Sequence, residues 1–270
     1  MFFRAVSCLS EPSGGEENSL SYNFFATVSR MKYIERWALM RSSRPENLSE
    51  HSLEVAMIAH ALCTIGNVRY GRHLDADRAA LIGIYHDASE IITGDMPTPV
   101  KYYNDEIRTA YKSVESVAED RLISLLPDDL RPTYEKIFRP VTIKSECGGT
   151  GDGPEGFGGD SEETPDVRGR ETLTEEEKAE AENDAYMRRL VKAADKLSAY
   201  IKCIEEENAG NNEFRTAKKT TGQAIRTMAE QYPEVGDFIR DFLPSYGNTL
   251  DELSRNREEY HESDNTIFTE

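Results

Sequence analysis

Four side chains in this sequence are of the types that bind transition metals. His51 is followed 35 residues later by the adjacent pair His86 and Asp87, and Asp195 lies further along the chain. Imidazole nitrogens and carboxylate oxygens together suit a borderline divalent metal. A set of two His and two Asp also leaves coordination positions open for water and substrate. Because the sequence has only five histidines, this arrangement predicts a hydrolytic metal centre.

Helical periodicity places these candidate ligands on inward-facing positions. His51 shares one helix face with three apolar residues at i+4, i+7 and i+11, which are Val55, Ile58 and Leu62. His86 and Asp87 are expected on a second helix, whose next turn brings Glu90 onto the same face. The predicted helices therefore direct the candidate ligands toward one interior region.

Asp195 is flanked by apolar residues, which predicts a buried carboxylate. Such a carboxylate needs a cation beside it, and an ion pair with Lys192 or Lys196 would meet that need without a metal. A lone histidine at position 51 is likewise more typical of a hydrogen-bonded core residue than of a ligand. A metal is favoured over these separate explanations because one ion accounts for all four positions.

The rest of the chain predicts helices and almost no strands. Residues 47–50 resemble a capping box that opens a helix ending near Ile65, and strict alternation of apolar and polar residues is rare. An apolar pattern from Phe24 to Trp37 predicts a first helix. We therefore expect an all-α fold. Further helices are expected from Asp75 onward and at 104–126, 184–208, 212–231 and 234–243.

The composition argues against several classes of partner. A net charge of −18 opposes binding to a nucleic-acid polymer, whose phosphates require a basic surface. The sequence has no run of 18 apolar residues, so we expect no membrane partner. The four cysteines are widely spaced without a CxxC pair, and the N-terminus lacks a secretory apolar segment. These features predict free thiols in a cytoplasmic protein.

An acidic, glycine-rich segment interrupts the helical pattern. Residues 144–184 contain 14 acidic and 4 basic residues, a net charge of −10, and eight of the 18 glycines. High charge with few apolar residues predicts a disordered insertion at 144–183. A GxGxxG match at 151–156 has no amphipathic helix after it, so it does not predict a dinucleotide site. The expected layout is a flexible tail at 1–20, one domain formed by 21–143 and 184–254, and a polar tail at 255–270.

Six short motifs extend the pattern of candidate ligands along the chain. They are RWALMR at 36–41, SEHS at 49–52, YHDASE at 85–90, TGDMPTPVKY at 93–102, KAAD at 192–195 and AGNNEF at 209–214. The order His, His-Asp, Asp resembles that of the HD-domain metal-dependent phosphohydrolases. The full set of motifs is more similar still to the bacterial 5′-deoxynucleotidases of the YfbR type. This resemblance covers residues 21–140 and 184–252, and it leaves out the N-terminal tail and the insertion.

The resemblance implies an HD-domain helical bundle that binds one divalent metal ion, with Co²⁺ favoured and Mn²⁺ or Cu²⁺ as substitutes. The implied reaction is hydrolysis of deoxyribonucleoside 5′-monophosphates to deoxynucleoside and phosphate, with low base selectivity and discrimination against ribonucleotides. A homodimer is also implied. The residues implied as metal ligands are His51, His86, Asp87 and Asp195.

The resemblance further implies Arg36, Asp87 and Glu90 as catalytic residues. Arg36 and Trp37 would hold and orient the 5′-phosphate, with the guanidinium meeting its charge. Glu90 would exchange a proton with the attacking water or the leaving oxygen. On spacing alone, Trp37 is as well explained by core packing and Asp95 by a turn cap. The residues implied in substrate binding are Arg36, Trp37, His51, Asp87, Asp95, Met96, Pro97, Thr98 and Asp195.

The positions of the other histidines predict one metal ion and not two. His60 follows His51 by nine residues and therefore faces the opposite side of the helix. His73 lies in a loop and His261 in the polar tail. No further histidine lies between His86 and Asp195 to extend the site.

Two other functions stay open on the sequence. The first is an HD-type deoxynucleoside triphosphate triphosphohydrolase, which would need more basic residues than Arg36 and Arg41 for the longer phosphate chain. The second is a non-catalytic metal-binding interaction module. Such a module would have no need of Arg36 or Glu90, which argues against it.

Overall fold

The structure, a computed structural model, describes residues 21–101, 103–140 and 174–254. The tails predicted at 1–20 and 255–270, and residues 144–173 of the predicted insertion, lie outside the described residues. Within those residues the β structure is limited to one bridge, between Glu35 and Asn47, so the predicted all-α fold is confirmed. The helices are α1 (Phe24–Val28), η1 (Ser29–Tyr33), α2 (Leu48–Tyr70), α3 (Ala76–Tyr85), α4 (Glu90–Thr93), α5 (Thr98–Lys101), α6 (Asp105–Ser124), α7 (Arg131–Phe138), α8 (Glu175–Asn208), η2 (Asn212–Phe214), α9 (Arg215–Gln231), α10 (Pro233–Asp241), η3 (Leu243–Gly247) and α11 (Leu250–Leu253).

Helix α2 carries His51, and local sequence signals set both of its ends. The Asn47 side chain accepts hydrogen bonds from the backbone N–H groups of Ser49 and Glu50, and Glu50 completes a capping box. Gly71 ends the helix in the left-handed conformation, with φ of 64°. The helix therefore extends to Tyr70, beyond the end predicted near Ile65.

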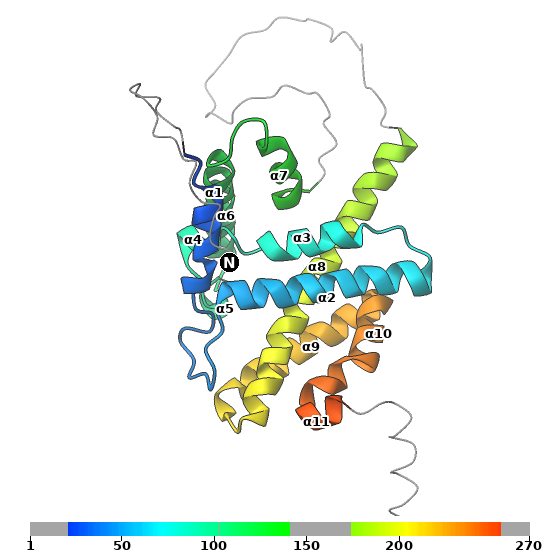
Figure 1. Ribbon diagram of the computed structural model, residues 1–270. Coiled ribbons are helices and arrows are strands. Elements are labelled where there is room, and N and C mark those ends of the chain that lie inside the picture. The colour runs from blue at the N-terminus through cyan, green and yellow to red at the C-terminus, as the bar shows by residue number, and fades with distance from the viewer. Residues whose placement is uncertain (1–20, 102, 141–173, 255–270) are drawn as a thin grey trace, which may run out of the picture.

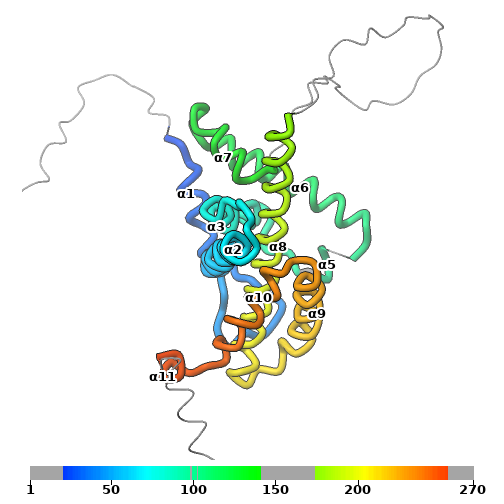
Figure 2. The backbone as a smooth tube through the Cα atoms, turned by 90° about the vertical axis from the view of Figure 1, so that its right-hand side faces the viewer, coloured from blue at the N-terminus to red at the C-terminus, as the bar shows by residue number. Residues whose placement is uncertain are grey.

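Helices α2, α3 and α8 form the centre of the fold. Figure 1 and Figure 2 show α2 and α3 side by side, with α8 crossing them. Helices α2 and α3 approach each other closely at Gly83, where an added Cβ would lie 2.8 Å from the Cα of Ala56. Apolar residues of α9 and α10 belong to the same core. Segments on both sides of residues 141–173 thus contribute to one core.

A smaller apolar cluster supports the chain that follows α3. Phe24 of α1 is fully buried and packs edge-on against Tyr134 of α7, with ring centroids 5.0 Å apart. Ala88 belongs to this cluster together with Leu122 of α6. Because Ala88 directly follows Asp87, burial of its methyl group anchors the turn that carries His86 and Asp87.

The prediction that His86 and Asp87 lie on a continuous helix with Glu90 is wrong. Helix α3 ends at Tyr85, and α4 begins at Glu90. The His-Asp pair therefore lies in the turn between two helices. A turn can direct two adjacent side chains toward the same point, whereas neighbours on a helix point about 100° apart.

Two helix boundaries also differ from the predictions. Helix α8 begins at Glu175, so residues 175–183, which were assigned to the insertion, are helical. The reason is a capping box in which Thr174 and Glu177 satisfy each other's backbone N–H groups, with acidic side chains in the first turn. The predicted first helix breaks after η1, where Ile34 is extended. Trp37 consequently lies in a loop. In residues 21–101, 103–140 and 174–254 no helix has the length and apolar character of a membrane span.

Candidate metal centre

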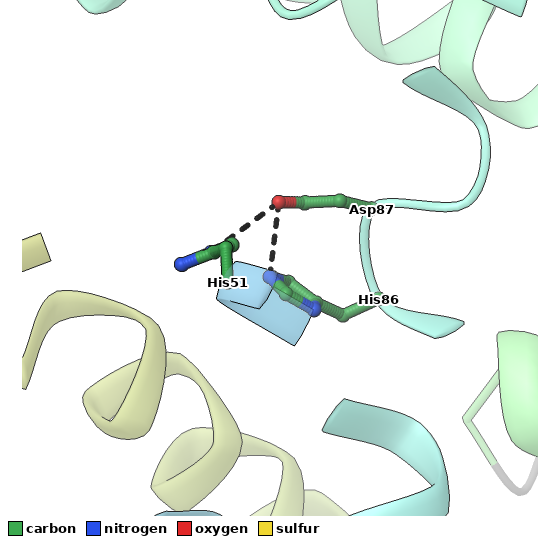
Figure 3. Close-up of side chains that lie close together, drawn as sticks. All are labelled: His51, His86 and Asp87. Carbon is green, nitrogen blue, oxygen red and sulfur yellow. Dashed lines mark ion pairs between the residues drawn. The ribbon is translucent and has the colours of Figure 1, made fainter. Parts of the chain in front are cut away.

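Three separate elements bring the predicted metal ligands together. His51 lies in the first turn of α2, His86 and Asp87 lie in the turn between α3 and α4, and Asp195 lies in α8. His51 is fully buried, and the other three are half-buried. Figure 3 shows the side chains of His51, His86 and Asp87 pointing toward one another.

The spacing of these three side chains suits a single metal ion. Asp87 Oδ2 lies 3.0 Å from His86 Nε2 and 3.6 Å from His51 Nε2, the two contacts dashed in Figure 3. One ligand atom from each residue lies within 4.8 Å of the other two. Ligands bound at about 2.1 Å in a tetrahedral arrangement are about 3.4 Å apart. Small side-chain adjustments would therefore close the group around a cation.

The hydrogen bonds of the histidine rings leave their Nε2 atoms free for a metal. His86 Nδ1 lies 2.7 Å from the carbonyl oxygen of Gly83, which can only accept, so Nδ1 carries the proton. His51 Nδ1 lies 2.9 Å from Ser198 Oγ, and Ser198 donates its own proton to Glu54 at 2.6 Å. Ser198 therefore accepts from His51. Both Nε2 atoms are buried, and neither has a hydrogen-bond partner among the residues that the structure describes. This orientation fits divalent-metal ligands.

Asp195 approaches the centre from the side of His51. Its Oδ1 lies 3.3 Å from His51 Nε2, while its Oδ2 lies 3.1 Å from Lys196 Nζ. The ion pair with Lys196 that the sequence left open is thus present, but it engages the other carboxylate oxygen. Asp195 is outside the group of three mutually close ligand atoms, so it is the ligand that must move furthest to join them.

Burial and neighbouring charges shift the pKa values of the titratable groups at the centre in different directions. Burial disfavours a charged His86, but the carboxylates of Asp87 and Asp195 outweigh it and raise the pKa of His86 to about 9. Burial also opposes ionisation of Asp87, yet the charge of His86 holds the pKa of Asp87 at about 2. Burial and the charge of Arg36 lower the pKa of His51. The carboxylates thus require a positive charge, which a proton on His86 provides and a divalent cation would replace.

Glu90 is a buried carboxyl group beside the centre. It begins α4, and its buried Oε2 has no hydrogen-bond partner in the described ranges. Burial, together with the negative charges of Asp87 and Asp95, raises the pKa of Glu90 to about 9. The raised pKa favours the protonated form of Glu90 in the metal-free protein.

Arg36 and Trp37 lie in the loop between η1 and α2, where one carboxylate binds both. Arg36 Nη1 and Trp37 Nε1 each donate a hydrogen bond of 2.9 Å to Glu46 Oε2. The indole packs against Phe214, with ring centroids 5.2 Å apart. The charge of Arg36 interacts with three nearby carboxylates besides Glu46, so its guanidinium lies near the predicted metal ligands. Those carboxylates are Asp87, Asp95 and Asp195.

The predicted nucleoside-pocket residues lie between α4 and α5. Asp95, Met96 and Pro97 are half-buried in this connection, and Thr98 begins α5, with its side chain outside what the structure describes. Burial raises the pKa of Asp95, and this effect is partly opposed by Arg36 and by a hydrogen bond from the backbone N–H of Trp37. Asp95 therefore lies beside the Arg36–Trp37 loop, whereas no direct contact places Met96 or Pro97 at the centre.

The sequence patterns did not single out several residues that support the centre. Glu54 lies three residues after His51 on the same side of α2, a spacing that does signal a shared face. Ser198 reaches His51 from 147 residues away, and Glu46 and Gly83 have no sequence signal linking them to the ligands. All four are supporting residues whose roles depend on tertiary contacts.

The remaining described histidines do not extend the site. The His60 side chain is half exposed, and its Nε2 lies 3.7 Å from Asp77 on the far side of α2 from His51. Apart from the group of His51, His86 and Asp87, the described ranges contain no further group of three metal-binding side chains.

Comparison with known proteins identifies the family. A family model described as 5′-deoxynucleotidase YfbR-like matches residues 23–149 and 170–246. The chain belongs to this family. A 5′-deoxynucleotidase of Vibrio vulnificus is 42% identical over 233 residues, which cover 86% of this chain and 98% of that protein. A 5′-deoxynucleotidase of Erwinia tasmaniensis is also 42% identical, over 86% of this chain and 96% of its own. The predicted family is thereby confirmed, and residues 150–169 fall outside the match.

Solved structures confirm the predicted HD-domain fold. An HD-domain phosphohydrolase of Listeria innocua superposes with a TM-score of 0.59 at 19% identity, covering 83% of this chain and 88% of that one. A predicted metal-dependent phosphohydrolase of Magnetospirillum magnetotacticum gives a TM-score of 0.50 at 20% identity, covering 85% and 92%. Because the identities are only 19% and 20%, these structures establish the fold of this chain and nothing beyond the fold.

Proposed function

We propose that this chain is a metal-dependent 5′-deoxynucleotidase, which hydrolyses deoxyribonucleoside 5′-monophosphates to deoxynucleoside and phosphate. The observation that carries the proposal is the convergence of His51, His86 and Asp87 in a chain of the YfbR-like 5′-deoxynucleotidase family. Relatives named 5′-deoxynucleotidases match over nearly their whole length. Low base selectivity and discrimination against ribonucleotides belong to the same proposal.

The proposed cofactor is one divalent metal ion, with Co²⁺ favoured over Mn²⁺ and Cu²⁺. His51 and His86 would bind it through Nε2, and Asp87 and Asp195 through carboxylate oxygens. When bound, a divalent cation neutralises phosphate charge and makes water more acidic. The mixed nitrogen and oxygen donor set supports a transition metal over Mg²⁺ or Ca²⁺, which prefer oxygen alone.

Arg36 and Glu90 have complementary roles in the proposed reaction. A guanidinium matches two phosphate oxygens in a planar arrangement, and Arg36 already lies among the carboxylates of the centre. In the metal-free protein burial raises the pKa of Glu90, and within the described part of the chain its Oε2 has no hydrogen-bond partner. Glu90 would pass its proton to the leaving 5′-oxygen, and it would then be able to take one from the attacking water.

Arg36 and Trp37 are proposed to hold the 5′-phosphate, and the connection between α4 and α5 is proposed to bind the nucleoside. Asp95 would accept a hydrogen bond from the sugar 3′-hydroxyl, and Met96, Pro97 and Thr98 would line the pocket. The contact between Asp95 and the Trp37 backbone supports a pocket formed by both loops. Discrimination against ribonucleotides would arise because a 2′-hydroxyl has no room in this pocket.

The assembly and location of the enzyme also remain proposals. A homodimer in the cytoplasm is supported by the family resemblance. Cys63 and Cys203 are buried free thiols, as expected in a reducing compartment. One HD domain that joins the residues before and after the insertion is supported by the shared core of α2, α3, α8, α9 and α10, with its second part beginning at α8 and not at residue 184.

Phosphate release from dAMP, AMP and dATP tests the proposed function. Metal-stripped protein is assayed with Co²⁺, Mn²⁺ or Mg²⁺ added back, and Glu90→Gln serves as the matched inactive variant. We expect metal-dependent phosphate release from dAMP and not from AMP. Release of tripolyphosphate from dATP without reaction of dAMP would instead identify a triphosphohydrolase. Absence of any reaction with metal bound would favour a binding module.

A further inference from the structure

We propose that Glu46 is a positioning residue that holds Arg36 and Trp37 in one arrangement facing the metal centre. This inference rests on the proposed role of Arg36 and Trp37 in substrate binding. Glu46 would not touch the substrate itself, and it would act through the two side chains that donate to it.

The first observation is the sharing of a single acceptor atom. Both Arg36 Nη1 and Trp37 Nε1 donate to Oε2 of Glu46 at 2.9 Å. The side chains of Arg36 and Glu46 are only 12% and 11% exposed. Hydrogen bonds to a charged acceptor in such a shielded environment are stronger than neutral or exposed ones. Movement of either donor would therefore break a strong contact.

The second observation is the backbone conformation of Trp37. Adjacent side chains in an extended segment point to opposite sides, so Arg36 and Trp37 would not ordinarily reach the same carboxylate. Trp37 has φ of 60°, the one positive value among the described residues other than glycine. The left-handed conformation is unfavourable for a residue other than glycine, because the Cβ lies too close to the following carbonyl oxygen. The hydrogen bond to Glu46 and the packing against Phe214 offset that cost.

The third observation links Glu46 to the metal ligands. The backbone N–H of Arg36 donates to the Glu46 carbonyl oxygen at 2.8 Å, and the bridge between Glu35 and Asn47 continues this pairing. Asn47 caps α2, and its carbonyl oxygen accepts from the backbone N–H of His51 at 3.1 Å. Glu46 thus joins the phosphate-binding pair to the helix that carries His51, which sets the distance between Arg36 and the centre.

The chain contains a built-in reporter for this arrangement, because Trp37 is its single tryptophan. Indole emission and acrylamide quenching therefore report on Trp37 directly in the metal-free protein. We would compare Glu46→Ala, which removes the acceptor, with Glu46→Gln, which keeps an acceptor oxygen but loses the charge. The matched control is Asp105→Ala, because Asp105 pairs with Arg108 at 3.0 Å on α6 and is exposed to solvent.

For Glu46→Ala we expect red-shifted Trp37 emission and more efficient quenching. The KM for dAMP should rise by about tenfold or more, the usual effect of losing a charge-assisted hydrogen bond, with a smaller change in kcat. Glu46→Gln should keep KM within about threefold because its amide oxygen still accepts from both donors. Co²⁺ affinity should be unchanged in both variants, and the Asp105→Ala control should match the wild type throughout.

Unchanged Trp37 emission and KM in Glu46→Ala would overturn the proposal. Equal defects in Glu46→Ala and Glu46→Gln would also overturn it, since an acceptor oxygen at this position would then not be what holds Arg36 and Trp37. If Glu46→Ala does not fold, Glu46→Asp takes its place, because the shortened carboxylate cannot reach both donors and should give the same emission shift. If the wild type fails to hydrolyse dAMP, the proposed function fails. The emission measurements would still decide whether Glu46 holds Trp37.

Discussion

Gly83 provides a sharp test of how the two histidine-bearing segments are held together. It lies on α3 where this helix meets α2, and its carbonyl oxygen accepts from His86 Nδ1. A Cβ at this position would lie 2.8 Å from Ala56 Cα and 2.9 Å from Ala56 N. These atoms belong to the α2 backbone and cannot rotate away as a side chain can. Gly83→Ala must therefore push α3 away from α2.

The magnitude follows from two opposing effects. Alanine favours a helix interior over glycine by about 1 kcal/mol, and overpacking a close contact costs about 1–3 kcal/mol. Since the clash is with backbone, we expect the upper part of that cost and a net loss of about 1–2 kcal/mol, which lowers the melting temperature by roughly 2–8 °C. Displacement of His86 should also weaken Co²⁺ binding about tenfold, as loss of a ligand's supporting contact does.

The assay combines thermal melting of the metal-free protein with Co²⁺ titration. The control is Gly236→Ala in α10, where an added Cβ meets nothing closer than 3.8 Å. This variant should gain up to about 1 kcal/mol from helix propensity and bind Co²⁺ as the wild type does. A Gly83→Ala protein that is as stable as Gly236→Ala, with normal Co²⁺ affinity, would refute the reasoning.

Further predictions concern the groups around the centre. Ser198→Ala should weaken Co²⁺ binding about 10–100-fold, because His51 loses the acceptor for its Nδ1 proton. Ser52→Ala, which removes a buried hydroxyl with no partner, should leave Co²⁺ binding intact. Glu90→Gln should abolish phosphate release from dAMP while metal content measured by mass spectrometry stays at the wild-type level. If Glu90→Gln instead lost its bound metal, Glu90 would be reassigned to metal binding. Burial raises the pKa of Glu54 from 4.5 to about 7, so ionisation of Glu54 destabilises the fold as pH rises through this range. Glu54→Gln should therefore raise the melting temperature at pH 8 and have little effect at pH 4.5. An equal shift at both values would contradict that assignment.

The sequence predicts those features of the metal centre that depend on residues close together in the chain. The spacing of His51 with Val55 and Ile58 places the imidazole on the buried stripe of α2, and the capping box at Asn47 marks where that helix begins. Both features depend on residues within a few positions of one another. The residue types at His86, Asp87 and Asp195 then indicated the chemistry, and the family motifs indicated the reaction.

The contacts that support the centre could not be predicted from the sequence, because they depend on tertiary structure. Ser198 meets His51 across 147 residues, and no local pattern selects that hydroxyl over others on α8. The left-handed backbone of Trp37 is also unexpected, since glycine or asparagine usually occupies such positions. The missed start of α8 has a different cause. The acidic residues at 175–177 resemble the preceding acidic segment in composition, but they stabilise a helix N-terminus once Thr174 caps it.

Titration of the metal-stripped protein with Co²⁺, with phosphate release from dAMP measured at each addition, tests the central claim most directly. The proposed centre of His51, His86, Asp87 and Asp195 predicts no release without metal and a linear rise that ends at one equivalent of Co²⁺ per chain. Release that continues to rise to two equivalents, or that proceeds in the absence of metal, would contradict a single-metal hydrolytic centre.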